Sequence, residues 1–172
     1  MATLRKGVCY RKLTRPYTRK SKFKKHSFIA MIPPSKIVKY NFGDMKKQFK
    51  YAFSLVSKQD LNLRDNSLES IRQIINSNLV EKLGNDFNMI VKAYPHHILR
   101  ENKMISGAGA DRMQTGMSHS FGKPTGRAAR INKGKAIVTV KVDENGIEIA
   151  RIALKKAMPR LPGKYVIEME KI

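Results

Sequence analysis

Residues 65–84, DNSLESIRQIINSNLVEKLG, predict the most regular helix of this chain. Its apolar residues recur at intervals of three and four, the spacing that places them on one face of a helix. They are Leu68, Ile71, Ile74, Ile75, Leu79 and Leu83. Asn66 is a favourable N-cap, Glu69 follows three residues later as in a capping box, and Gly84 suits the C-cap. We therefore expect a helix over residues 67–83 with one face buried in a core.

Strand patterns lie on both sides of this helix. Residues 49–55 and 61–63 alternate apolar and polar side chains, and so do residues 37–42 and 164–171. Residues 87–94 form an apolar run closed by Pro95, residues 135–142 (KAIVTVKV) form another, and residues 28–32 form a short one that ends at Pro33 and Pro34. These seven segments are the expected strands.

Residues 143–158 fit two structures. Asn145-Gly146 is a strong hairpin turn signal, and Ile147 and Ile149 alternate with Glu148. The alanines, the LKK run and the stop at Pro159 favour a helix instead. We predict a helix over about residues 145–158, although the sequence alone does not decide between the two.

The order of elements predicts an α+β fold, with a mixed β-sheet and two helices packed on it. With 172 residues, the chain is long enough for one domain with its own core. We expect a single domain whose body comprises residues 28–102 and 135–172. A basic extended arm, residues 1–27, precedes the body, and a glycine-rich basic loop, residues 103–134, is inserted in it.

The net charge indicates a polyanionic partner. The chain carries 35 Lys and Arg against 13 Asp and Glu, a net charge of +22. Self-repulsion at this density opposes a compact monomer, and nucleic acid is the usual partner of a basic globular chain. Cys9 is the single cysteine, so neither an intrachain disulfide nor a cysteine-based zinc site can form. We expect a cytoplasmic protein that has no signal peptide, no membrane span and no tendency to form homo-oligomers.

The N-terminal arm is the first candidate nucleic-acid site. No acid precedes Asp44, whereas a solvated surface usually mixes the two signs of charge. Aromatic residues such as Tyr10 and Tyr17 are interleaved with the bases and could stack on unpaired bases of RNA. The bases expected to contact phosphates are Arg5, Lys6, Arg11, Lys12, Arg15, Arg19, Lys20, Lys22, Lys24 and Lys25.

The loop is the second candidate site. Its glycines permit close backbone approach. Those expected to do so are Gly107, Gly109, Gly116, Gly122 and Gly126. The side chains expected to contact RNA are Arg112, Gln114, His119, Lys123, Arg127 and Arg130. The alternative is a disordered linker, but linkers seldom interrupt one domain.

Enzyme chemistry has little support in the sequence. GAGADR lacks the third glycine of a dinucleotide loop, and no Gly-Lys pair is followed by Ser or Thr, so a phosphate-binding loop is excluded. His96 and His97 are adjacent but have no carboxylate or thiol cluster with them, and Cys9 has no recognisable base. We expect no catalytic residues, no metal site and no cofactor.

The combined motifs resemble a universal large-subunit ribosomal protein family, called L sixteen in bacteria and L ten e in archaea and eukaryotes. The central stretch LRENKMISGAGADRMQTGMSHSFGKPTGRAARI carries the resemblance, together with CYRKLTRPYTRKSKF, IPPSKI, LRDNSLESIR and PHHILRENK. The similarity covers essentially the whole chain. The GAGADR motif and the N-terminal arm resemble the archaeal branch of the family. GMSHSFGKPTG departs from the commoner family wording, which makes a role for His119 less secure than one for Arg112.

The resemblance implies a structural, non-catalytic constituent of the large ribosomal subunit. Its partners would be large-subunit rRNA, neighbouring ribosomal proteins and A-site tRNA, contacted directly or indirectly. The loop would extend toward the peptidyl-transferase centre. The alternative is an RNA-binding assembly factor that is not present in every subunit.

Overall fold

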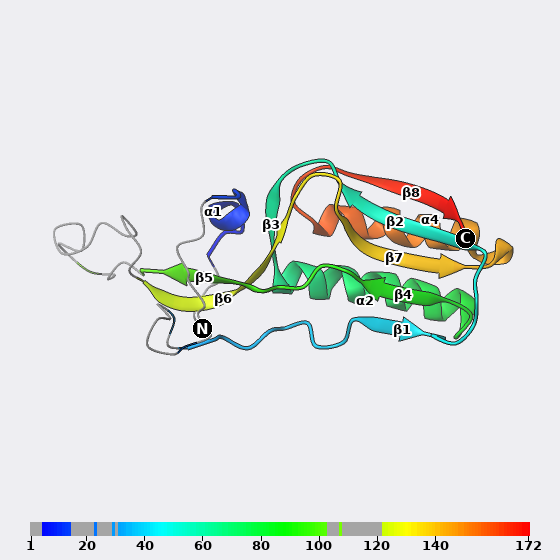
Figure 1. Cartoon of the computed structure of the whole chain (residues 1–172), viewed down its shortest axis with the longest axis horizontal. Helices are drawn as coiled ribbons and strands as arrows, with labels where there is room; N and C mark the ends of the chain where they lie inside the picture. Colours follow the sequence, from blue (N-terminus) through cyan, green and yellow to red (C-terminus); the bar gives the residue numbers. More distant parts are fainter. Residues whose placement is uncertain (1–4, 15–22, 24–28, 30, 103–106, 108–121) are drawn as a thin grey trace.

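The computed structural model describes residues 5–14, 23, 29, 31–102, 107 and 122–172. Two antiparallel sheets and their helices make up this part of the chain (Figure 1). The five-stranded sheet has the order β1 (Asn41–Gly43), β4 (Asn88–Val91), β7 (Ala136–Val142), β2 (Tyr51–Ser57) and β8 (Tyr165–Lys171). The three-stranded sheet has the order β3 (Leu61–Arg64), β6 (Lys123–Ile131) and β5 (His97–Glu101). The helices are α1 (Val8–Arg11), α2 (Asp65–Leu83) and α4 (Ile147–Ala157), with short 3-10 turns η2 (Glu144–Gly146) and η3 (Met158–Arg160).

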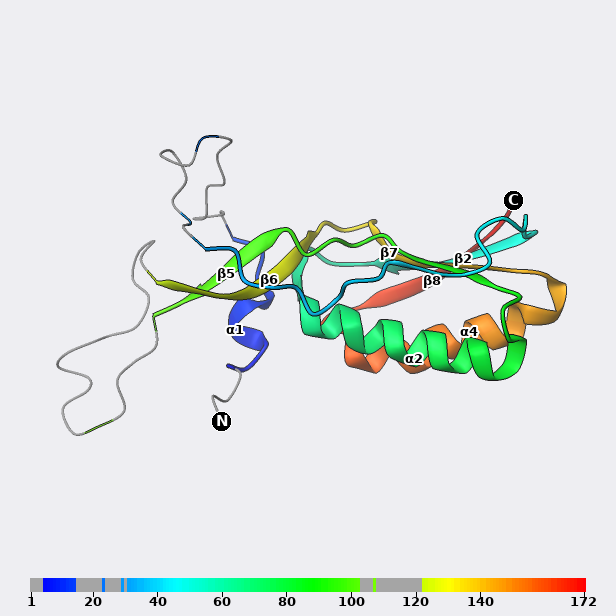
Figure 2. The ribbon, with the colours of Figure 1, turned by 90° about the horizontal axis from the view of Figure 1, so that it is seen from below.

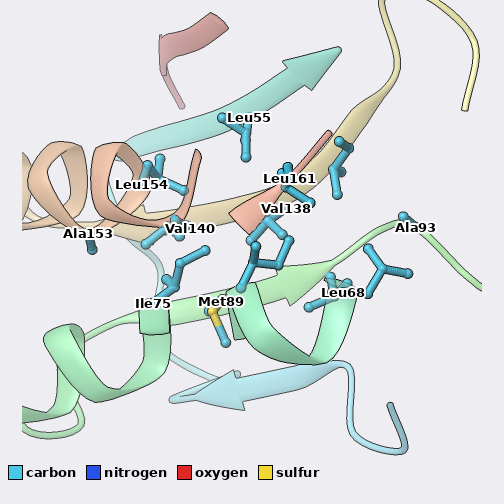
Figure 3. Packing of buried hydrophobic residues seen from close by; sticks show 14 of the residues in the cluster. Leu55, Leu68, Ile75, Met89, Ala93, Val138, Val140, Ala153, Leu154 and Leu161 are labelled. Atoms are coloured by element: carbon cyan, nitrogen blue, oxygen red, sulfur yellow. The ribbon is translucent and has the colours of Figure 1, made fainter. Parts of the chain in front are cut away.

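Helices α2 and α4 lie side by side on one face of the five-stranded sheet (Figure 2). The apolar stripe of α2 is buried there, with Leu68, Ile71 and Leu79 fully inaccessible to solvent. Leu55, Val138 and Val140 face these helices from the sheet, as Figure 3 shows. Burying a side chain of this size stabilises a fold by about 1.5–3 kcal/mol relative to leaving it in water, so this layer holds most of the core.

The three-stranded sheet begins in that core and extends away from it (Figure 1). Leu61 and Leu63 of β3 lie opposite Ile131 and Ala129 of β6, and all four belong to the core cluster. Beyond this point β6 continues with β5 alone, past the end of the two helices. The far half of this sheet therefore has no helix of the core layer beneath it.

Gly43 ends β1 where the chain backbone passes close to β4. Its φ is 79°, and a Cβ at this position would lie 1.9 Å from the carbonyl oxygen of Phe87. The same carbonyl accepts a hydrogen bond from the backbone N–H of Asp44 at 2.8 Å. Only glycine combines this left-handed conformation with so close an approach.

The α+β class and the helix expected from residues 67–83 are confirmed, with a different N-terminus. Helix α2 begins at Asp65 and its N-cap is Arg64, not Asn66. The Asp65 carboxylate accepts hydrogen bonds from the backbone N–H groups of Asn66 and Lys36, which anchors the first turn. Glu69 does not close a capping box, because both its oxygens bind Arg72, at 2.6 and 2.8 Å.

Residues 147–157 are helical, so the helix expected over residues 145–158 is confirmed and the hairpin is not formed. Gly146 serves a tight approach: a Cβ there would lie 2.9 Å from the Cβ of Val142. The strands expected at 49–55, 61–63, 87–94, 135–142 and 164–171 are present with shifted ends. Every strand pairing among the described residues is antiparallel, so the expected mixture of parallel and antiparallel strands is wrong.

The N-terminal part of the body departs from expectation. The strand expected over 37–42 shortens to Asn41–Gly43, and residues 29, 31 and 32, the described part of the strand expected at 28–32, are not in a strand. Pro33 and Pro34 lack the N–H groups a sheet edge would use. In the arm, Val8–Arg11 forms a short helix, so the expected extended conformation is wrong for these residues.

The boundary of the glycine-rich loop also needs correction. Residues 123–131 were expected within the loop but form β6, and β5 precedes it at His97–Glu101. Strand β6 is the centre of its sheet and is hydrogen-bonded on both edges, which outweighs the weak strand preference of Pro124 and Gly126. The described residue Gly107 lies in a bend, and the division into a single domain remains a prediction.

Candidate nucleic-acid interface

Basic side chains gather on the elements around the three-stranded sheet. We define the basic end as residues 5–14, 33–36, 61–65, 97–101 and 123–131. Its acids are Asp65 and Glu101. Its bases are Arg5, Lys6, Arg11, Lys12, Lys36, Arg64, Arg100, Lys123, Arg127 and Arg130. Such an excess on one part of the surface is the electrostatic footprint of a nucleic-acid-binding protein.

One face of the three-stranded sheet carries the arm. The side-chain amide of Asn62 donates to the carbonyl oxygens of Tyr10 and Lys12, at 3.2 and 3.0 Å. Arg64 donates to the carbonyl of Arg5 at 2.9 Å, and Arg130 donates to that of Thr14 at 2.9 Å. Residues 5–14 are therefore fixed to the sheet through their own backbone, which leaves Lys6, Arg11 and Lys12 exposed.

Tyr10 is the aromatic centre of this face. Its hydroxyl donates to a carboxylate oxygen of Glu101 at 3.3 Å, and the guanidinium carbon of Arg64 lies 5.4 Å from its ring centroid. Arg5 lies 3.9 Å from the other oxygen of Glu101. Partial burial, and then the charge of Glu101, raise the pKa of Tyr10, so the phenol stays protonated and remains a donor.

The opposite face of the sheet holds residues 33–36, as Figures 1 and 2 show. Arg127 and Arg130 are three residues apart in one strand, so their side chains point to opposite faces. The Nε of Arg127 donates to the carbonyl oxygen of Pro33 at 2.6 Å. The far half of the sheet is thus sandwiched between two basic segments that are distant in sequence.

Three arginines of the basic end, Arg64, Arg127 and Arg130, keep N–H donors that a partner could use. A guanidinium has five N–H donors and is always charged. Among the described residues, the hydrogen bonds of Arg64, Arg127 and Arg130 each engage one of its N–H groups. These bonds orient the guanidinium planes, so the remaining donors are held in place for phosphate oxygens.

His97 lies on the same face as Arg130. Burial lowers its pKa to about 4, and the charges of Arg130, His96 and Arg100 act in the same direction. The ring is therefore neutral at physiological pH and adds no charge to the surface. Within the described ranges, no group of three or more His, Cys, Asp and Glu could hold a metal ion.

The structure places part of the predicted site. Arg5, Lys6, Arg11 and Lys12 lie in the arm beside the sheet, and Lys123, Arg127 and Arg130 lie on β6 rather than in a loop. Gly122 immediately precedes β6, Gly126 lies within it, and Gly107 is exposed. The remaining predicted residues lie outside the described ranges: Arg15, Arg19, Lys20, Lys22, Lys24, Lys25, Gly109, Arg112, Gln114, Gly116 and His119.

The structure adds three residues that the sequence analysis did not select. Asn62 and Arg64 hold the arm, and Arg100 adds a base on β5. Asn62 and Arg64 alternate with the buried Leu61 and Leu63, so the period-two pattern already places them on the polar face of their strand. Nothing in that pattern says that the arm covers this face.

The other end of the five-stranded sheet has a balanced surface. Lys47 lies 3.1 Å from Asp86 and 3.0 Å from Asp143, and Lys50 lies 3.4 Å from Glu144. In the part of the chain that the structure describes, no helix is long and apolar enough to cross a membrane. Of the described residues, those of the basic end therefore carry positive charge at the highest density, with ten bases against two acids.

Comparison with known proteins identifies relatives over nearly the full length. The family model described as Ribosomal protein L16p/L10e matches residues 15–168. The chain is 44% identical over 163 residues to the large ribosomal subunit protein uL16 of Metallosphaera sedula, covering 92% of this chain and 90% of that protein. It is 43% identical over 169 residues to the uL16 protein of Thermofilum pendens, covering 96% and 97%, and 42% identical over 170 residues to that of Sulfolobus acidocaldarius, covering 96% and 93%.

Proposed function

The chain belongs to the ribosomal protein L16p/L10e family, and from this premise we propose that its basic end binds large-subunit rRNA and helps to position aminoacyl-tRNA. As a member of this family it is a structural constituent of the large ribosomal subunit and so acts in the cytoplasm. Its other partners are the neighbouring proteins of that subunit. We propose no catalytic role, because the family to which the chain belongs consists of ribosomal proteins.

One observation carries the RNA-binding proposal. Ten Lys and Arg and only two acids occupy the basic end, and five hydrogen bonds between its segments run from side chains to backbone carbonyls. These five bonds neutralise no charge, so the positive charge of the arginines that make them stays available. RNA phosphates supply the missing anions, and their binding releases counterions.

The tRNA part of the proposal rests on the loop that β5 and β6 carry. Both strands run out from the core, and residues 102–122 connect their far ends. Arg112 lies in this connection, and the resemblance of its GAGADR motif to the family assigns the loop to the tRNA side. We expect Arg112→Ala to slow accommodation of aminoacyl-tRNA while leaving the amount of protein per subunit unchanged.

The central experiment measures incorporation. Tagged chain should sediment with large subunits at physiological salt, at one copy per mature subunit. A copy number well below one in mature subunits, with enrichment in precursor particles, would instead identify an assembly factor. Failure to sediment with either particle would exclude both functions.

Salt dependence tests the surface itself. Log affinity falls as log salt concentration rises, and removing one phosphate contact makes this slope less steep by about 0.7–0.9. We expect Arg11→Gln to lower the slope for a large-subunit rRNA fragment by that amount. Lys82→Gln, an equally exposed change in the last turn of α2, should leave the slope unaltered.

A further inference from the structure

A cavity of about 430 Å³ lies where the arm, the three-stranded sheet and the start of α2 meet. Arg5 and Tyr10 line it from the arm, Ser35 from the segment after the proline pair, Asn66 from α2 and Arg127 from β6. Sites for small ligands generally measure about 300–1,000 Å³, so this cavity is large enough for one nucleotide.

The charges of its walls favour an anion. Four bases line it: Arg5, Lys36, Arg64 and Arg127. The two acids in the lining are already engaged. Asp65 accepts from the backbone N–H groups of Lys36 and Asn66, at 3.0 and 2.9 Å, and Glu101 accepts from Tyr10 and lies near Arg5. The guanidinium groups therefore supply the free donors, which suits a phosphate.

The cavity also offers flat surfaces. The Tyr10 ring and the Arg64 guanidinium lie against each other, and the rings of Pro33 and Pro34 form another part of the wall. Tyrosine rings and arginine planes are the surfaces on which unstacked bases of RNA are bound. A plain phosphate would leave this part of the cavity without a partner.

One polar atom of a lining residue, the buried Oδ1 of Asn66, has no hydrogen-bond partner among the described residues. A buried polar atom left unsatisfied costs about 1–3 kcal/mol, so a bound group that reaches it gains that amount back. An asparagine amide pairs with the amino group and ring nitrogen of adenine.

We propose that this cavity binds one unstacked nucleotide of RNA, with its phosphate on the arginines and its base against Tyr10 and Asn66. The proposal rests on the rRNA-binding function proposed above and assigns it a single-nucleotide site. Because Arg5 and Tyr10 belong to the arm and Arg127 to β6, the nucleotide would also bind the arm and the sheet together.

Chemical probing of assembled subunits tests this site. Large subunits carrying the wild-type chain and subunits carrying Asn66→Asp are treated with dimethyl sulfate, which methylates N1 of adenine and N3 of cytosine, and with a carbodiimide, which modifies N3 of uracil and N1 of guanine. Asp is favourable in the first turn of a helix, so the variant should fold. Its charge opposes the phosphate, and its side chain lacks the amide donor. We expect one base, protected in the wild type, to become several-fold more reactive.

Asn76→Asp is the matched control. It makes the same change on the same helix, away from the cavity lining, and should leave every reactivity unaltered. Tyr10→Leu gives an independent second variant, and it should expose the same base. In the wild type, ultraviolet crosslinking should join Tyr10 to that base, as seen by mass spectrometry of residues 7–11.

The outcomes separate the two proposals. Normal incorporation of the wild type and both variants, with no base changing reactivity, would overturn the nucleotide site and leave rRNA binding intact. Failure of the wild-type chain to enter subunits would overturn the rRNA-binding function and the site with it.

Discussion

In the five-stranded sheet, side chains that are fully inaccessible to solvent face α2 and α4. The ion pairs near this sheet, Lys47–Asp86 and Lys50–Glu144, lie at the surface. In the three-stranded sheet, both faces are covered by extended or short helical segments held by Asn62, Arg64, Arg127 and Arg130. The first arrangement draws its stability from buried apolar area, which involves no charge for salt to screen and needs no partner. The second arrangement draws its stability from single hydrogen bonds to backbone carbonyls, which leave the positive charge of the arginines in place.

Substitutions should therefore affect the five-stranded sheet with its helices and the basic end independently of each other. A change in the five-stranded half removes buried area and should lower the global free energy of unfolding. A change at the basic end should loosen a segment locally and weaken RNA binding.

The largest effect is expected for Leu79→Ala. Leu79 is fully buried on α2, and truncating such a leucine usually lowers the free energy of unfolding by about 2–5 kcal/mol. Denaturant unfolding of the purified chain measures it. Val80→Ala, the neighbouring change on the exposed side, should remain within about 0.5 kcal/mol. Equal effects of the two would mean that α2 does not form the core described above.

Gly43→Ala should follow. An alanine in an unfavourable backbone conformation costs about 1–3 kcal/mol, and at this position the added carbon also overlaps the Phe87 carbonyl. Gly84→Ala is the matched control, because Gly84 also has a positive φ, of 60°, but has open space around it. In thermal unfolding, the melting temperature of Gly43→Ala should therefore be clearly lower than that of Gly84→Ala. The reverse order would show that the β1–β4 contact is loose.

Arg127→Ala probes the basic end. It removes the hydrogen bond to Pro33, a loss of about 0.5–1.5 kcal/mol. Amide exchange should accelerate at Ser35 and Lys36 and in β6 while α2 stays protected. Lys123→Ala, an exposed change in the same strand, should leave exchange unaltered. Loss of protection throughout α2 would contradict the separation of the two halves.

The smallest effect concerns His97 and pH. The pKa of His97 falls from the ordinary 6.5 to about 4 in the folded chain, so between these values the unfolded chain binds the extra proton. Stability should consequently fall as pH falls from about 6.5 to 4. His97→Asn should reduce this slope in denaturant unfolding at pH 7, 5.5 and 4.5, and His96→Asn serves as the control. Partial exposure keeps the effect small. A slope unchanged by His97→Asn would exclude this residue as its source.

The sequence predicted the parts that depend on local spacing. The stripe from Leu68 to Leu83 identified α2, and the run in residues 135–142 identified β7. The α+β class followed from their order. Residues 147–157 were harder because Asn145-Gly146 resembles a hairpin turn, and the alanines, the LKK run and the stop at Pro159 correctly predicted the helix.

The elements and contacts that the sequence did not predict depend on pairing with distant parts of the chain, which leaves no local pattern in the sequence. Strand β6 contains Pro124 and Gly126, and its pairing with both β3 and β5 defines it. Arg130 reaches the carbonyl of Thr14, 116 positions away, and Asn62 reaches that of Lys12. A backbone carbonyl looks the same in every residue, so spacing patterns cannot predict which one an arginine will bind.

The strand order has a consequence for the chain before it meets RNA. Strand β8 is an outer strand of the five-stranded sheet, and such an open edge can pair with another copy and start aggregation. Its outward residues include Glu168 and Glu170, both exposed. A second copy aligned along β8 would bring its own glutamates toward these two. Two of the thirteen acids of this basic chain thus lie on its open edge, where their repulsion disfavours pairing with a second copy.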